Sequence, residues 1–202
     1  MLGRMQLLQR FREATRPLHG AIEADFQPRQ HLGSLADYRR MLVRFWGIHQ
    51  PLEESIAPFA DQWPLDWEKT RRRVPQLRAD LLQLGLSTAD LEAIDRCRAV
   101  PRANSPAGVL GALYVAEGSR LGAVLVGGAV VERLGLTPER GAAFLCGAGS
   151  ETGQLWRSFV AVVQSADLTR EEADEAVDIA AGTFRAFHEW LRASATGSTT
   201  NA

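Results

Sequence analysis

Residues 107–134 read AGVLGALYVAEGSRLGAVLVGGAVVERL and are the most informative part of the chain. The stretch is apolar at helical spacing and follows a turn-rich segment, residues 101–106. It holds six of the 18 glycines of the protein, between Gly108 and Gly128. Each glycine destabilises a helix by up to about 1 kcal/mol relative to alanine. We therefore expect one long helix whose glycines are compensated by something that approaches the backbone closely.

The glycines of this helix allow two interpretations. At 100° per residue, three of them fall on one stripe: Gly111, Gly118 and Gly122. In one interpretation, small residues let another helix approach; in the other, a flat ligand lies against bare backbone. Glu117, Ser119 and Arg120 stand amid apolar residues, which suits the edge of a polar cavity better than pure helix packing. The residues alone leave both interpretations open.

The rest of the chain also predicts helices, because strand-like alternation is scarce and helix caps recur. Ser34 with Asp37 resembles a capping box, and Pro51 is expected to bend or interrupt the helix that follows. Besides residues 107–134, we expect helices over residues 34–57, 67–84, 88–98, 138–147, 151–165 and 169–191. The prediction is an all-α protein with one domain over residues 1–192 and a disordered polar tail over residues 193–202.

Composition narrows the class of protein. The 202 residues are 46% hydrophobic and 23% charged, which favours a soluble globular domain. The net charge of -1 shows no excess of basic residues of the kind that binds nucleic acid. Cys97 and Cys146 lie far apart, so neither a disulfide framework nor a zinc or iron–sulfur site is encoded, and a cytoplasmic protein is expected. We predict no signal peptide and no membrane span, since the longest uncharged apolar run, residues 121–131, is shorter than the roughly 20 residues a span requires.

Histidine is scarce, and one of the four has a suggestive neighbour. Glu23 follows His19 by four residues, so a carboxylate on the same helical face could orient the imidazole as a metal ligand. Such a histidine is more often a surface or core residue. His49 and His188 stand on aromatic-rich helices and are interpreted as packing residues, and His31 as a loop residue.

Two segments together resemble a known family. ATRPLH at residues 14–19 followed by Glu23, and LYVAEGSRLGA at residues 113–123, resemble the proximal and distal helix motifs of heme oxygenases, most closely of the bacterial, biliverdin-producing branch. Ser119 and Ala123 stand where the animal enzymes have aspartate and glycine. The resemblance covers residues from about 5 to 192 and implies a single-domain heme oxygenase-like helical bundle.

The same resemblance implies roles for individual residues. His19 would be the ligand of heme iron, with Glu23 beside it. Gly118 and Gly122 would bring their backbone to the porphyrin, with Ser119 close to the oxygen-binding side; these three are the expected catalytic residues.

The remaining basic and tyrosine positions are expected at the edge of the heme. Arg12, Tyr114 and Arg157 match positions that contact the heme propionates in relatives. Arg120 is larger than expected in this motif, and since an inward side chain would occlude the ligand, we expect it to face solvent or a propionate.

The implied activity is O2-dependent cleavage of heme to biliverdin with release of iron and carbon monoxide. No flavin, nicotinamide or iron–sulfur motif is present, so electrons would come from a ferredoxin- or flavodoxin-type protein or a reductase, and a phytochrome could accept the biliverdin. Three alternatives stay open: a heme-binding or heme-sensing protein of the same fold, a helical interaction module without heme, and a helical enzyme acting on thiamine fragments. The last would need a nucleophile, and only Cys97 and Cys146 are thiols.

Overall fold

The computed structural model describes residues 6–25, 27, 30, 32–147 and 149–193, with the side chains of residues 6, 23, 125 and 193 excepted. Its described residues form eight α-helices and no strand. The β-type pairing that they show is limited to isolated β-bridges from Thr137 to Arg140 and Gly141. The α-helices are α1 (Gln6–Asp25), α2 (Leu35–Ile56), α3 (Val74–Gln83), α4 (Thr88–Ala93), α5 (Pro106–Leu134), α6 (Ala143–Cys146), α7 (Thr152–Ser165) and α8 (Arg170–Ala193). Three single-turn helices of other types accompany them: η2 (Ala57–Gln62), η3 (Trp67–Arg71) and η4 (Gly149–Glu151). The all-α prediction is confirmed.

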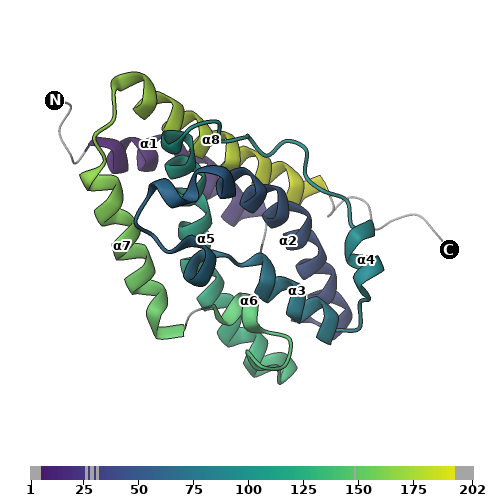
Figure 1. Ribbon diagram of the computed structural model, residues 1–202. Coiled ribbons are helices and arrows are strands. Elements are labelled where there is room, and N and C mark those ends of the chain that lie inside the picture. Colours follow the sequence, from purple (N-terminus) through teal and green to yellow (C-terminus); the bar gives the residue numbers. More distant parts are fainter. Residues whose placement is uncertain (1–5, 26, 28–29, 31, 148, 194–202) are drawn as a thin grey trace.

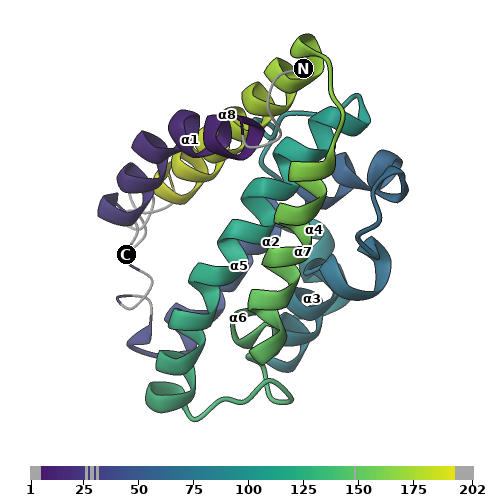
Figure 2. The same cartoon turned by 90° about the vertical axis from the view of Figure 1, so that its left-hand side faces the viewer.

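Helix α5 runs through the middle of the molecule, and the other helices are arranged around it (Figure 1). Its N-terminal half packs against α8, and α1 lies along α8. Helices α2, α6 and α7 contact α5 from other sides. Figure 2 shows α1 and α8 as a pair at one side of α5, while α7 runs beside α5 along its length. The hydrophobic core is one cluster that draws on residues from Leu8 to Leu191.

Helix ends follow the local signals in the sequence. The Ser34 hydroxyl accepts a hydrogen bond from the Asp37 N–H at 3.1 Å, and Ser87 with Asp90 completes a capping box for α4. Ser105 caps α5 in the same way, by accepting from the Gly108 N–H at 3.0 Å. Gly135, at φ +65°, ends α5 in the left-handed conformation that only glycine adopts easily. Short-range capping therefore sets where these helices begin and end.

Several expected helices are shorter or differently divided. The helix expected over residues 67–84 is broken between Arg71 and Val74, where Arg72 is extended and Pro75 lies in the first turn of α3. Helix α4 ends at Ala93 rather than near Arg98, and of residues 138–147 only Ala143–Cys146 are helical. Pro51 does not interrupt α2, which is continuous from Leu35 to Ile56. Tertiary hydrogen bonds, such as Cys97 N–H to Gly47 O at 2.8 Å, hold the shortened ends in place.

The glycines of α5 do not share one environment. A Cβ atom added to Gly111 would lie 2.1 Å from the carbonyl oxygen of Ala176 on α8, so this glycine allows the two helices to touch. Gly127 plays the same part toward α6, with a Cβ 2.7 Å from Leu145 O. For these positions, the first interpretation of the glycines is the correct one.

By length and composition, helix α5 could cross a membrane. The expectation of no membrane span considered only the uncharged run at residues 121–131, which is shorter than the apolar part of this helix. However, 59% of its most apolar window is buried inside the protein, as in the core helix of a globular domain. Residues 1–5, the predicted tail from residue 194 onward and His31 lie outside the described residues.

Candidate functional site

Helix α1 carries His19 on a surface that borders α8. Phe11 and Leu8 anchor the N-terminal part of α1 in the core, at 0% and 6% exposure. His19, two turns further along, is exposed, and its ring lies 6.0 Å from the ring of Phe184 on α8. The anchor thus fixes the helix while the imidazole remains accessible.

A contact between α1 and α5 lies one helical turn before His19. The buried Thr15 hydroxyl donates to Phe11 O at 2.7 Å and lies 3.5 Å from the Tyr114 hydroxyl. The Tyr114 ring stacks on Phe11 at 4.8 Å and lies 6.0 Å from Trp156 of α7. Tyr114 therefore joins α1, α5 and α7 at one point.

Beyond this point, α5 exposes bare backbone. Cβ atoms added to Gly118 and Gly122 would meet no heavy atom within 4 Å, apart from α5 itself. Leu121 and Val124, which follow on the neighbouring surface of the helix, are 38% and 37% exposed. For these two glycines the close neighbour is absent among the described residues, so the first interpretation does not account for them.

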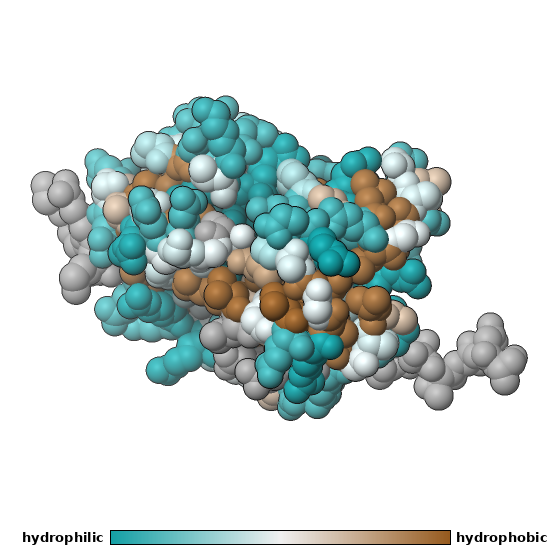
Figure 3. Space-filling view, turned by 90° about the horizontal axis from the view of Figure 1, so that it is seen from below, coloured by the Kyte–Doolittle hydropathy of each residue, from teal (hydrophilic) through white to brown (hydrophobic). Residues whose placement is uncertain are grey.

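The open glycines and His19 lie on the same side of the Tyr114 contact. Gly118 follows Tyr114 by one turn on α5, and His19 follows Thr15 by one turn on α1. Figure 2 shows the two helices running apart from there. Figure 3 views the molecule from the end at which α5 finishes and shows hydrophobic residues gathered over the middle of that face. An exposed imidazole on α1 and an unobstructed backbone on α5 thus follow the Tyr114 contact on their two helices.

Ser119 connects this region to the buried side of α5. Its hydroxyl donates to Ala116 O at 2.8 Å and accepts from the Arg73 guanidinium at 3.3 Å. Arg73 is 2% exposed, donates to Phe144 O at 2.7 Å and lies 3.9 Å above the Phe144 ring. Burial and the neighbouring Arg120 lower the pKa of Arg73 to about 9, which leaves it protonated at neutral pH.

The expectation for Arg120 is wrong. Its side chain faces neither solvent nor the open region: it is 1% exposed, donates to Arg71 O at 2.7 Å and lies 3.8 Å from the Glu117 carboxylate. The reason is helical geometry, since two residues of an α-helix turn by about 200° and Arg120 therefore projects from the side opposite Gly118.

Glu117 and two arginines form a buried charge cluster behind the glycine face. Arg71 lies 3.1 Å from Glu117 and also donates to Leu65 O at 2.6 Å and to the Ser158 hydroxyl at 2.7 Å. The cluster ties the π-turn η3 and α7 to the middle of α5. Its effect is to fix the rotation of α5 and hence the direction in which Gly118 and Gly122 face.

His49 is a packing residue, as predicted. It is 2% exposed and makes edge contacts with Phe144 and Phe187 at 5.1 and 5.4 Å. Burial, and then the charges of Arg73 and Arg120, hold its pKa well below the usual value, so the ring is neutral at pH 7. His188 differs from the prediction, because it also bonds to the Asp25 carboxylate at 2.7 Å.

Arg12 and Arg157 lie beside the two rings that flank Tyr114. Arg12 follows Phe11 on α1, Arg157 follows Trp156 on α7, and both side chains are exposed. Neither makes an ion pair with another described residue. The structure thus brings two cations to the neighbourhood of the Tyr114 contact.

The remaining predicted site residue is Glu23, which lies in α1 but whose side chain is outside the described residues. In the described part of the chain, no group of three or more His, Cys, Asp or Glu side chains could hold a metal ion. His19 is an exposed imidazole, a group that can ligate the iron of a heme.

Sequence reasoning missed Arg71 and Arg73 as partners of the site. The three consecutive arginines at residues 71–73 fall inside the helix expected over residues 67–84, and no partner was assigned to them from the sequence. Two features of the sequence could have revealed these arginines. Pro75 favours the first turn of a helix and so indicates a new helix start after residues 71–73. Glu117 and Arg120 stand in an apolar stretch, and charges buried there require partners.

Comparisons with known proteins identify the fold and the family. The heme oxygenase family model matches residues 5–193. The solved structure of heme oxygenase from Leptospira interrogans is 17% identical, with a TM-score of 0.71, covering 94% of this chain and all of that one. The NO- and CO-bound heme oxygenase from Neisseria meningitidis is 22% identical, with a TM-score of 0.72, covering 99% and 96% of the two chains. No curated protein matches. The fold is that of these two structures, and by its family match the chain belongs to the heme oxygenase family.

Proposed function

We propose that this protein cleaves heme to biliverdin, with release of iron and carbon monoxide, using O2 and electrons from a separate donor protein. Family membership supports a heme oxygenase function in general. One observation supports the specific assignment: Gly118 and Gly122 leave α5 without side chains on the side of the Tyr114 contact where His19 is exposed.

His19 is proposed to hold the heme iron through its imidazole. Heme, when bound, supplies the metal at which O2 is activated; the protein supplies ligation, orientation and protons. A neutral imidazole is a suitable ligand because it gives less electron push than a thiolate. Glu23 is proposed to orient the ring from the same helical face.

Gly118 and Gly122 are proposed to admit the porphyrin and a layer of water above it. Ser119 is proposed to position one of these water molecules. Its hydroxyl proton points to Ala116 O, and one oxygen lone pair accepts from Arg73, which leaves the other lone pair for a water molecule. Because Arg73 stays protonated, it keeps Ser119 oriented for that water.

The charged edge of the ligand is proposed to contact Arg12, Tyr114 and Arg157. Two propionates carry negative charge, and guanidinium groups bind carboxylates through paired hydrogen bonds. These contacts would fix the rotation of the heme in its plane and thereby select the bond that is cleaved. A ferredoxin- or flavodoxin-type donor, or a reductase, completes the reaction, and a phytochrome-type acceptor is a candidate for the product.

A hemin titration tests the ligand assignment. We expect one hemin per chain and a Soret band that His19→Ala shifts or abolishes, while His31→Ala, a change of the same type at a predicted loop residue, leaves it unchanged. An identical Soret band in His19→Ala would refute the role of His19. Absence of any hemin binding would favour an interaction module.

Turnover tests the glycine face. Reductant and O2 should convert bound hemin to biliverdin, identified by chromatography. Gly118→Leu should fold but lose turnover at least about tenfold, because a side chain would occupy the space above the porphyrin. Gly128→Leu is the matched control, since Gly128 lies on the same helix with open space around its Cβ position. Intact heme in the wild-type protein would instead indicate heme binding or sensing.

A further inference from the structure

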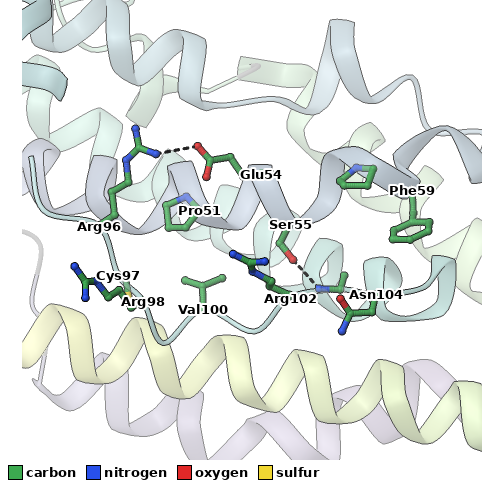
Figure 4. A pocket seen from close by; sticks show the side chains of 12 residues that line it. Pro51, Glu54, Ser55, Phe59, Arg96, Cys97, Arg98, Val100, Arg102 and Asn104 are labelled. Carbon is green, nitrogen blue, oxygen red and sulfur yellow. Dashed lines mark hydrogen bonds and ion pairs between the residues drawn. The ribbon is translucent and has the colours of Figure 1, made fainter.

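A second concave region lies away from the residues assigned to heme. It is a cavity of about 630 Å³ between the C-terminal half of α2 and residues 95–105, the segment that links α4 to α5 (Figure 4). None of the residues proposed to bind heme lines it. Its volume lies within the range of about 300–1,000 Å³ that is typical of small-molecule sites.

The linking segment is fixed to its surroundings at several points. The Cys97 N–H donates to Gly47 O at 2.8 Å. Ser55 donates to Pro101 O at 3.1 Å and accepts from the Ala103 N–H at 2.7 Å. On the other side, Pro101 packs against α8 so closely that a Cβ on Gly182 would lie 2.8 Å from its ring. The wall of the cavity is therefore formed before any ligand arrives, which reduces the entropy lost on binding.

The segment presents a regular set of side chains to the cavity. All five even-numbered residues from 96 to 104 line it, and three of them are arginines: Arg96, Arg98 and Arg102 (Figure 4). Cys97 and Ala103, between them, are each 5% exposed and anchor the backbone. The three arginines thus line one cavity, with Arg96 turned toward Glu54 and Val100 lying between Arg98 and Arg102 (Figure 4).

The positive charge of the cavity is only partly compensated. Glu54 pairs with Arg96 at 3.2 Å and is the only carboxylate among the lining residues, against three guanidinium groups. Among the described residues, neither Arg98 nor Arg102 has a hydrogen-bond or ion-pair partner. Like charges along one concave surface raise the local positive potential, and a bound anion lowers its electrostatic cost.

Apolar groups complete the lining. Pro51, Pro58 and Phe59 line the α2 side, and Val100 lies between the arginines of the linking segment. Guanidinium groups recognise carboxylates and phosphates through paired hydrogen bonds, while flat apolar walls bind rings or chains. We propose that this cavity binds a small organic anion in which a carboxylate or phosphate is attached to an aromatic or aliphatic body, held by Arg98 and Arg102 against Pro51, Phe59 and Val100.

Calorimetric titration of the hemin-saturated protein tests the proposal, because the heme site is then filled. The probes are naphthoate, naphthyl phosphate, the uncharged naphthalenemethanol and inorganic phosphate alone. We expect saturable binding of one naphthoate or naphthyl phosphate, binding of the uncharged analogue at least about tenfold weaker, and weaker binding in high salt. The carboxylate and phosphate arms show which head group is preferred. If hemin does not bind, the same titrations on the hemin-free protein test this cavity independently.

Substitutions locate the binding. Arg98→Gln with Arg102→Gln should weaken naphthoate binding by about tenfold or more, since each lost contact to a charged group is large. Arg170→Gln, at an exposed arginine outside the cavity, is the control and should have no effect. Glu54→Gln should strengthen binding severalfold, because it removes the competing carboxylate from Arg96.

Four results would overturn the proposal: no binding of either anion, equal binding of the uncharged analogue, equal binding of inorganic phosphate alone, or full binding by the Arg98 and Arg102 double variant. The heme proposal is unaffected by any of them, since its tests use hemin spectra and product analysis.

Discussion

Two regions of α5 use the same residue type for opposite purposes. Near the start of the helix, Gly111 lets α8 approach until the Ala176 carbonyl would touch a Cβ atom, and Gly127 near its end does the same for α6. Between them, Gly118 and Gly122 have no such neighbour among the described residues. Glycine is therefore required for packing at Gly111 and Gly127 and leaves an open surface at Gly118 and Gly122. The difference shows that a glycine stripe acquires its meaning from what lies opposite, not from its spacing.

Helix α5 also has a buried side near Gly118, whose charge cluster fixes the rotation of the helix, and the largest expected effect lies there. Glu117→Ala should lower the free energy of unfolding by about 3–5 kcal/mol, because it leaves Arg71 and Arg120 buried without their carboxylate. Denaturant unfolding measures this. Glu68→Ala removes an exposed ion pair with Arg72 and should change stability by less than about 1 kcal/mol. Equal effects of the two variants would show that the buried cluster has no special role.

The close contact between Gly111 and α8 is tested by adding one methyl group. Gly111→Ala should destabilise the protein by about 1–3 kcal/mol or more, because α5 and α8 must separate to accommodate a Cβ that would lie 2.1 Å from a carbonyl oxygen. Thermal unfolding checks the prediction. An unchanged melting temperature would mean that α8 does not press on this glycine.

The buried His49 of α2 predicts that stability depends on pH. His49 has a folded-state pKa well below its unfolded value, so the unfolded state takes up a proton first as the pH falls through about 6.5. Stability is therefore fully present above that pH and is lost below it, by up to about 1.4 kcal/mol per pH unit for one proton. His49→Leu should flatten the loss between pH 7 and 5, as followed by denaturant unfolding at each pH. A slope identical to that of the wild type would exclude His49 as its source.

The smallest expected effect is a gain in stability rather than a loss. It distinguishes the open glycines of α5 from the packed Gly111 most clearly. Gly122→Ala should stabilise the hemin-free protein by about 0.5–1 kcal/mol, because alanine favours the helix and its Cβ enters open space. Turnover of the hemin complex should nevertheless fall. Destabilisation by this variant would mean that the face is already filled and leaves no room for a porphyrin.

Much of the fold was predictable because its signals are local. Ser34, Ser87 and Ser105 form caps with residues three positions later, and Gly135 ends α5. The motif around His19 and the one around Gly118 also lie within single helices. By contrast, the Arg71 to Arg73 run was misinterpreted, because its partners Glu117, Ser119 and Phe144 are distant in sequence.

The sequence by itself determined that the chain is helical, where α2, α5, α7 and α8 begin and end, and which family the two motifs resemble. It did so because caps, turns and helix periodicity depend on residues a few positions apart. Only the tertiary structure decided which glycines of α5 touch α8 and which remain open, that Arg120 points into the protein, and that three arginines of a loop line one cavity. Those properties depend on distances between segments far apart in the chain, and spacing along the sequence does not fix them.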